Sequence, residues 1–189
     1  MTALGRSERL ALSASAGLGY VAAAAWFSAR PRRRELAAFH ASNSGGEYAV
    51  LRLPQQLGTP WALVAAAALQ VCARRPGRAV LVLGVLPAEK AVEVITKRIT
   101  DRARPVYVTP TELRDDAPVD GPSFPSGHAA IAAAVTAVCT PRLPHWAAVA
   151  LAGCAAIGAW VRVHQGAHHP GDVVGGLLLG TSLGSAVAG

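Results

Sequence analysis

Three short segments of this 189-residue chain carry side chains that could act together on one anionic group. They hold three cations, two histidines, a serine–glycine pair and one carboxylate: Lys97 and Arg104; Ser126, Gly127 and His128; and Arg162, His168 and Asp172. Three fixed cations suit a dianionic ligand, for which phosphate is the obvious candidate. The residue types therefore predict a phosphate site.

The third segment also predicts a nucleophile. Pro170 is typical of the first residue of a helix, which would place His168 just before that helix and Asp172 in its first turn. Asp172 could then accept a hydrogen bond from one ring nitrogen of His168 and leave the other nitrogen free to attack. This is the orienting arrangement of a catalytic triad, with histidine as the nucleophile.

The second segment has the composition of a helix N-terminus. Pro125 and Ser126 precede an apolar run, which predicts Ser126 as the N-cap and leaves the backbone amide of Gly127 free. Free amides and the helix macrodipole bind anions at such a terminus and contribute about 0.3–2 kcal/mol. His128 would lie in the first turn, beside a bound phosphate.

The elements that must position these segments are long apolar runs, of which five are uncharged and the third, which begins at residue 79, becomes increasingly polar towards residue 99. Hydrophobic residues make up 52% of the chain and charged residues 15%, too little charge to cover a soluble protein of this length. The runs approach the roughly 20 residues that a membrane-spanning helix needs, and they lack the alternation of barrel strands. They cover residues 10–29, 53–73, 79–99, 121–141, 143–161 and 173–189. We therefore expect an all-α fold, a six-helix transmembrane bundle.

The order of the runs predicts where the candidate site residues come together. By the parity of crossings, the connections at residues 100–125 and 162–172 emerge on the same face of the membrane. Charges in the bilayer centre cost about 2.5–3.5 kcal/mol each, so these side chains are expected at a polar cavity. The sequence thus predicts an active site at one membrane boundary.

We expect a single membrane-embedded domain over residues 1–189. Its motif-bearing core covers residues 79–189, and residues 1–78 supply two leading spans and a connecting segment. That segment contains the basic RPRRR cluster, typical of an anionic-lipid contact, and a surface helix near residues 35–40. Lysines and arginines do not decide which side of the membrane the site faces.

Composition also excludes several classes. The chain is too apolar to be disordered, and its three cysteines do not form a disulfide scaffold. Its formal charge of +7 is not gathered on one helical face, so no nucleic-acid partner is expected. No zinc or nucleotide motif occurs, and a solvated loop is the preferred interpretation of three aspartates: Asp115, Asp116 and Asp120.

The three segments resemble the three motifs of the type 2 phosphatidic acid phosphatase superfamily in order, spacing and placement between the third and sixth runs. That family includes integral-membrane lipid phosphate phosphatases, soluble acid phosphatases and vanadium haloperoxidases. The matching motifs are Lys97-x6-Arg104-Pro105, Pro125-Ser126-Gly127-His128 and Arg162-x5-His168-x3-Asp172.

The resemblance implies a role for each residue. His168 would form a phosphohistidine, oriented by Asp172, and His128 would protonate the leaving group. No metal or other cofactor is implied for a phosphatase member. Valine replaces the usual serine before the arginine, at Val161, which removes a hydroxyl but no charge. The implied phosphate ligands are Lys97, Arg104, Ser126, Gly127 and Arg162.

The expected partners are the bilayer and a membrane lipid phosphate, for a multi-pass protein of the cell membrane. Resemblance to small bacterial members favours polyprenyl phosphates or pyrophosphates, or phosphorylated polyprenyl sugars. Phosphatidic acid and phosphatidylglycerol phosphate are close alternatives. A lipid phosphotransferase would use the same residues, whereas a haloperoxidase would need vanadate, and a membrane scaffold or transporter would not need the histidines.

Overall fold

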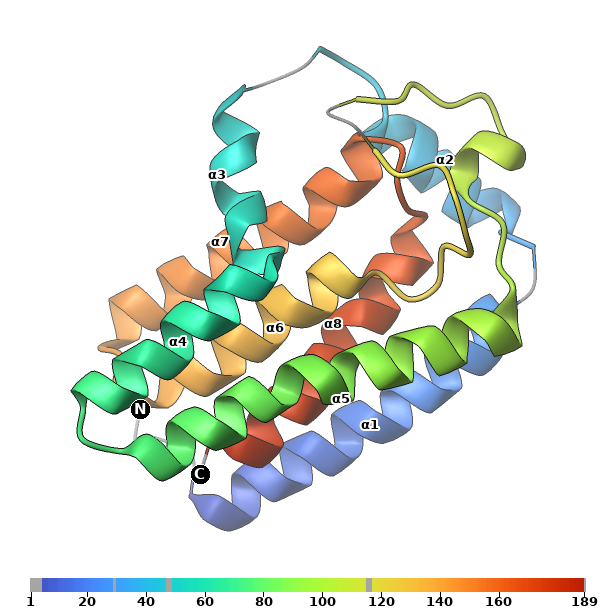
Figure 1. Ribbon diagram of the computed structural model, residues 1–189. Coiled ribbons are helices and arrows are strands. Elements are labelled where there is room, and N and C mark those ends of the chain that lie inside the picture. Colours follow the sequence, from blue (N-terminus) through green and yellow to red (C-terminus); the bar gives the residue numbers. More distant parts are fainter. Residues whose placement is uncertain (1–4, 29, 47–48, 115–116, 189) are drawn as a thin grey trace.

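The computed structural model describes residues 5–28, 30–46, 49–114 and 117–188, and within these ranges it is all-helical. The predicted all-α class is confirmed. The longer helices are α1 (Arg6–Phe27), α4 (Pro60–Cys72), α5 (Pro76–Thr100), α6 (Gly127–Cys139), α7 (His145–His164) and α8 (Pro170–Val187) (Figure 1). The shorter ones are α2 (Arg33–Ser42), α3 (Arg52–Gln55) and 3-10 turns at Ala49–Leu51, Gln56–Gly58, Pro105–Tyr107 and Thr140–Arg142. The expected surface helix is α2.

Two of the six expected runs form shorter helices than their lack of charge indicated. Thr59 is extended, as residues before proline usually are, so α4 begins only at Pro60. Ser126 is also extended after Pro125, and α6 begins at Gly127. Both helices have 13 residues, fewer than a straight crossing needs. Within the described ranges, α1 and α7 are long and apolar enough to cross a membrane by length and composition.

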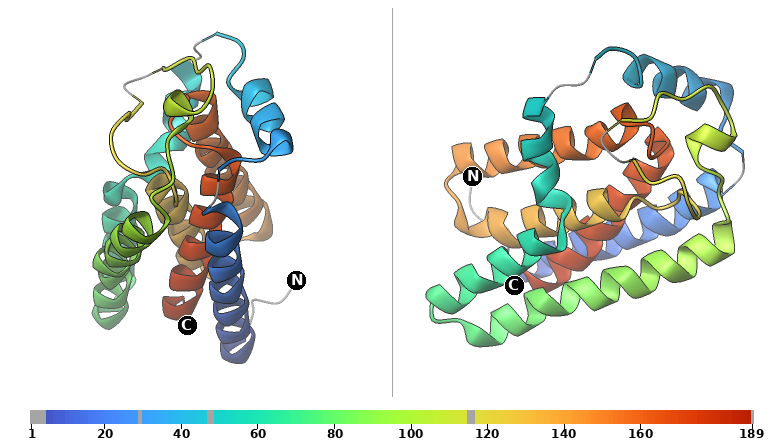
Figure 2. Two further views of the ribbon diagram at one scale, coloured as in Figure 1. Left: turned by 90° about the vertical axis from the view of Figure 1, so that its right-hand side faces the viewer. Right: turned by 45° about the horizontal axis from the view of Figure 1, so that its top comes forward.

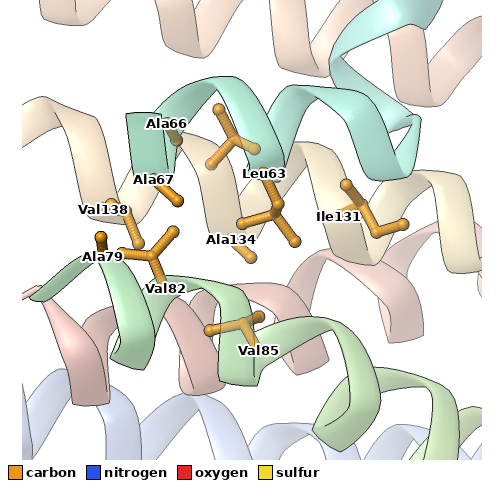
Figure 3. Close-up of a cluster of buried hydrophobic side chains, with 10 residues drawn as sticks. Leu63, Ala66, Ala67, Ala79, Val82, Val85, Ile131, Ala134 and Val138 are labelled. Carbon is orange, nitrogen blue, oxygen red and sulfur yellow. The ribbon is translucent and has the colours of Figure 1, made fainter. Parts of the chain in front are cut away.

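Helices α4, α5 and α6 share an apolar core of small and medium side chains (Figure 3). The shortness of these side chains allows the three helices to approach one another closely. The cluster is formed by Leu63, Ala66 and Ala67 of α4, Ala79, Val82 and Val85 of α5, and Ile131, Ala134, Val135 and Val138 of α6.

Glycines bring α8 against α6. Gly176, Gly180 and Gly184 are four residues apart, and a Cβ on Gly180 would overlap the backbone of Ala130 in α6. Small residues at this spacing let two helix backbones approach, as is common in membrane proteins. The N-termini of α6 and α8, which carry the second and third motifs, therefore lie at the same end of the bundle (Figure 1).

Burial follows an unusual pattern along the bundle. The outer faces of the long helices expose large apolar side chains, among them Leu18, Trp61, Val80 and Trp146. Buried charged and polar side chains concentrate instead at one end, where α2 gathers with the loops that precede α6 and α8 (Figure 2). Extended apolar faces with an internal polar site are what a lipid environment favours.

Candidate active site

A cavity of about 550 Å³ lies at the polar end of the bundle and collects six of the eight predicted site residues. Its volume is within the range of small-molecule sites. Both histidines and all three motif cations line it, together with one glycine: Lys97, Arg104, Gly127, His128, Arg162 and His168. The other two predicted residues, Ser126 and Asp172, are fully buried behind this surface.

His168 lies in the turn before α8 with its Nδ1 atom 3.5 Å from Oδ2 of Asp172. That distance is longer than a strong hydrogen bond, but it sets which edge of the ring faces the carboxylate. Because Nδ1 is buried, the ring presents Nε2 to the cavity. Burial lowers the pKa of His168 to about 4, although the neighbouring Asp172 opposes this shift. The imidazole is therefore neutral near pH 7, the form that a nucleophile requires.

Asp172 has a second partner that the motif spacing did not reveal. The Nη1 atom of Arg102 lies 2.5 Å from Oδ1 of Asp172, and its Nη2 atom lies 2.7 Å from Oε2 of Glu35. The other oxygen of Asp172 accepts a hydrogen bond of 2.8 Å from the amide of His169. Both carboxylate oxygens are thus held, which fixes the face that Asp172 turns to His168.

Glu35 connects this network to the helix α2. Its Oε1 atom accepts a hydrogen bond of 2.9 Å from the amide of Gly171, in the first turn of α8, where an anionic side chain is favoured. The sequence does not distinguish Arg102 from the nearby, exposed Arg98. The partners of Arg102, Glu35 and Asp172, lie 67 and 70 residues away in the chain. Motif spacing could not identify Arg102.

Arg104 ties together the loops that carry the other two motifs. Its Nε atom donates to the carbonyls of Asp120 and Gly121 at 2.9 and 3.1 Å, and its Nη1 atom donates to the carbonyl of Ala167 at 2.7 Å. Burial lowers the pKa of Arg104, but a guanidinium remains cationic in proteins. Arg104 therefore positions the histidine-bearing loops in addition to lining the cavity.

The remaining cations come from two helices. Arg162 lies in the last turn of α7, and its Nη1 atom donates to Oε1 of Gln165 at 2.6 Å. Lys97 lies near the end of α5, with its Nζ atom 2.7 Å from Oε1 of Glu93. Glu93 and its neighbour Glu89 also line the cavity, and the motif spacing identified neither of them.

The start of α6 has the predicted residues in a modified arrangement. Ser126 is the N-cap, but its hydroxyl makes no capping hydrogen bond, and its buried Oγ atom has no partner within the described residues. The amide of Ser126 donates instead to the carbonyl of Asp172 at 2.9 Å, which joins the starts of α6 and α8. A Cβ on Gly127 would lie 3.1 Å from the carboxylate of Glu93, so glycine keeps this wall of the cavity open.

Several residues near the three motifs lie outside the cavity lining. Val161 is a buried residue of α7, and the ring nitrogens of His164 lie 2.8 and 3.2 Å from the backbone carbonyls of Ser42 and Gly46. His169 packs against Phe39. Asp115 and Asp116 fall outside the described residues, and Asp120 contributes its carbonyl to Arg104. In the described ranges, no three histidine, cysteine or acidic side chains form a metal-binding group.

Comparison with known proteins gives two findings. The family model of the PAP2 superfamily matches residues 78–188. The crystal structure of the first transmembrane PAP2-type phosphatidylglycerolphosphate phosphatase from Bacillus subtilis is similar with a TM-score of 0.74 at 23% identity, covering 93% of this chain and 94% of that chain. A search of curated proteins found no match. The structural similarity establishes that the two chains share a fold.

Proposed function

The chain belongs to the PAP2 superfamily, and we propose that it is a lipid phosphate phosphatase that works through a covalent phosphohistidine at His168. The observation that carries the proposal is the composition of one cavity. Its lining combines two histidines and the three motif cations with apolar side chains that include Leu86 and Ile131. A phosphate attached to a hydrocarbon tail fits this combination.

In the first step, Nε2 of His168 attacks phosphorus in line with the bond to the leaving oxygen. The new N–P bond forms as the P–O bond breaks, and His128 donates a proton to the departing alkoxide. General acid catalysis of this kind contributes about 10²–10⁴ in rate. Lys97, Arg104 and Arg162 stabilise the charge on the equatorial oxygens, and a fixed geometry avoids reorganisation at the moment of reaction.

In the second step, water hydrolyses the phosphohistidine. His128, now neutral, accepts a proton from the water as its oxygen bonds to phosphorus, and the N–P bond breaks to restore the neutral imidazole of His168. Inorganic phosphate then leaves. Every proton transfer in this cycle is assigned to a side chain of the chain itself, so we propose a metal-independent reaction.

We place the protein in the cell membrane as a multi-pass protein, with the cavity at the membrane boundary and the lipid tail in the bilayer. Phosphorylated polyprenyl lipids, including polyprenyl diphosphates and phosphorylated polyprenyl sugars, are the favoured substrates. Phosphatidylglycerol phosphate is the alternative that the structurally similar Bacillus subtilis phosphatase supports, because its name specifies that activity.

The test is phosphate release by the purified chain from a panel of these lipid phosphates, with phosphatidic acid included. His168→Ala should remain folded and lose essentially all turnover, because no other group can form the N–P bond. Vanadate should inhibit as a mimic of the five-coordinate transition state, and EDTA should have no effect. Undiminished release by His168→Ala would refute the assignment.

The intermediate can be sought directly. With a phosphate ester whose leaving group needs no general acid, His128→Ala should slow only the hydrolysis of the phosphohistidine, because water then lacks its base. A substrate labelled in the phosphate should leave an acid-labile, base-stable label on the His128→Ala chain and none on the double variant that also carries His168→Ala. An equal label on both chains would place the covalent bond elsewhere.

A further inference from the structure

We propose that Glu89, assisted by Glu93, forms a subsite for a hydroxyl-bearing group attached to the scissile phosphate. Among the substrates proposed above, this subsite favours those whose phosphate is esterified to a polyol or sugar, such as phosphorylated polyprenyl sugars, over polyprenyl phosphates and diphosphates. This inference rests on the proposed phosphatase function and narrows its substrate class.

The first support is the order of side chains along α5. Glu89, Glu93 and Lys97 are spaced four residues apart, so they lie on one face of the helix. All three line the cavity. At 1.5 Å per residue, Glu93 and Glu89 lie about 6 and 12 Å along the axis from the phosphate-binding lysine. The two carboxyl groups therefore form the wall next to the phosphate end.

The second support is a difference in partners between the two carboxyl groups. The oxygens of Glu93 lie 2.7 Å from Lys97 and 2.7 Å from Lys90. Glu89 is only 3% exposed, and its buried Oε1 atom has no hydrogen-bond partner in the part of the chain that the structure describes. A buried polar atom without a partner is unfavourable by about 1–3 kcal/mol. A donor on the ligand would remove this cost.

The chemistry of that donor follows from the surroundings. An alkyl chain or a deprotonated second phosphate offers no hydrogen-bond donor and would leave the Oε1 atom of Glu89 unsatisfied. A hydroxyl group is neutral and donates. Beyond Glu89 the wall of α5 becomes apolar at Leu86 and Pro87. From Lys97 towards Leu86, α5 thus lines the cavity with a cation, then with two carboxyl groups and Lys90, and then with apolar side chains. This order fits a phosphate, a hydroxylated carbon and a hydrocarbon chain.

The experiment compares two lipid phosphates that differ by a single hydroxyl group: 1-oleoylglycerol 3-phosphate and 1-oleoylpropane-1,3-diol 3-phosphate. For the unmodified full-length chain, kcat/KM should be about tenfold or more higher with the hydroxylated lipid, as expected for a hydrogen bond to a charged group. Glu89→Ala should remove most of this preference, measured as the ratio of kcat/KM for the two lipids within the same variant. Glu89→Gln keeps an acceptor oxygen and should retain part of the preference.

The matched control is Glu8→Gln, which neutralises an exposed carboxylate in the first turn of α1 and should change neither rate. Equal rates for the two lipids in the unmodified chain would overturn the inference, and they do so even where Glu89→Ala fails to fold. Equal losses with both lipids in Glu89→Gln would also overturn it, although the phosphatase proposal would stand. The third outcome concerns the unmodified chain. If it releases no more phosphate than His168→Ala does, from either lipid, both the phosphatase proposal and this inference are overturned.

Discussion

Two networks of charged side chains lie at or near the candidate active-site cavity, and only one of them lines it. In the first, Arg102 joins Glu35 and Asp172, with side chains of Arg102 and Asp172 that are 2% and 0% exposed. In the second, Glu93 joins Lys90 and Lys97, whose side chains are 68% and 21% exposed. None of the three residues of the first network lines this cavity, whereas Glu93, Lys90 and Lys97 all line it.

This difference in burial indicates that the two networks have different roles. A buried ion pair is strongly destabilised when one partner is removed, because the other charge is left in a low-dielectric interior. A partly exposed pair contributes little to stability, because solvent screens it. We therefore expect the Arg102 network to hold the catalytic geometry and the Lys97 network to exchange partners with the substrate.

The largest effect should come from Arg102→Met, which leaves two buried carboxylates without their cation. We expect a loss of about 3–5 kcal/mol in the free energy of unfolding, and about 10³-fold in kcat because His168 loses its orientation. Thermal unfolding in detergent would measure the loss of stability, and phosphate release would measure the loss in kcat. Arg98→Met, in the last turn of α5, is the matched control and should change neither. An Arg102→Met chain as stable and active as the control would remove the distinction between the networks.

Lys97→Ala should produce the next largest effect, and in a different quantity. The loss of one phosphate-binding cation should lower kcat/KM by about 10²-fold, in line with the loss of one electrostatic contact at a transition state. The free energy of unfolding should change by less than about 1 kcal/mol, because Lys90 remains as a cationic partner 2.7 Å from Glu93. A large drop in stability with little change in kcat/KM would assign Lys97 to the structural network instead.

The pH dependence should report on the buried network. Because burial lowers the pKa of His168 to about 4, protonation of the nucleophile should begin to reduce kcat/KM only near pH 4, with about a tenfold loss by pH 3. Asp172 opposes the effect of burial, so Asp172→Asn should move this acid limb to lower pH. The same substrate ionises identically in both measurements, so the displacement belongs to the enzyme. If the acid limb of kcat/KM does not move in Asp172→Asn, then Asp172 does not influence the protonation of His168.

The smallest expected effect is that of Glu93→Gln on product binding. Its carboxylate engages Lys97 and adds a negative charge at the phosphate end of the cavity. Neutralising it should tighten inhibition by inorganic phosphate by about threefold, which a Ki measurement can resolve. Weaker inhibition by inorganic phosphate would mean that Glu93 is needed to orient Lys97. The Lys97 network would then hold side chains in position, as the Arg102 network does.

Several local features of the site could be predicted from the sequence. Pro170 does begin α8, Asp172 lies in its first turn, and Ser126 is the N-cap of α6. These features depend on the preferences of a few consecutive residues, which any similar segment would share. The same local rules would have corrected the expected lengths of α4 and α6, because prolines 60 and 125 interrupt the uncharged runs.

Other features depend on residues far apart in the chain. The glycines of α8 could be read as a contact face, but their partner, the backbone at Ala130 in α6, could not. The free hydroxyl of Ser126 and the cavity face of Glu89 also depend on what packs around them. The absence of charged residues identified the apolar runs, but it could not show which helices pack against each other.

The sequence by itself predicted the candidate site residues, and it determined the class of fold and the points where the two motif helices begin, because caps, prolines and helical spacing act over a few residues. Only the tertiary structure decided that Arg102 holds Asp172, that Glu35 reaches the start of α8, and that two carboxyl groups line the cavity beside the cations. The physical reason is that a buried charge must find its partner in space, and the packing of helices, not their order in the chain, sets which partner is within reach.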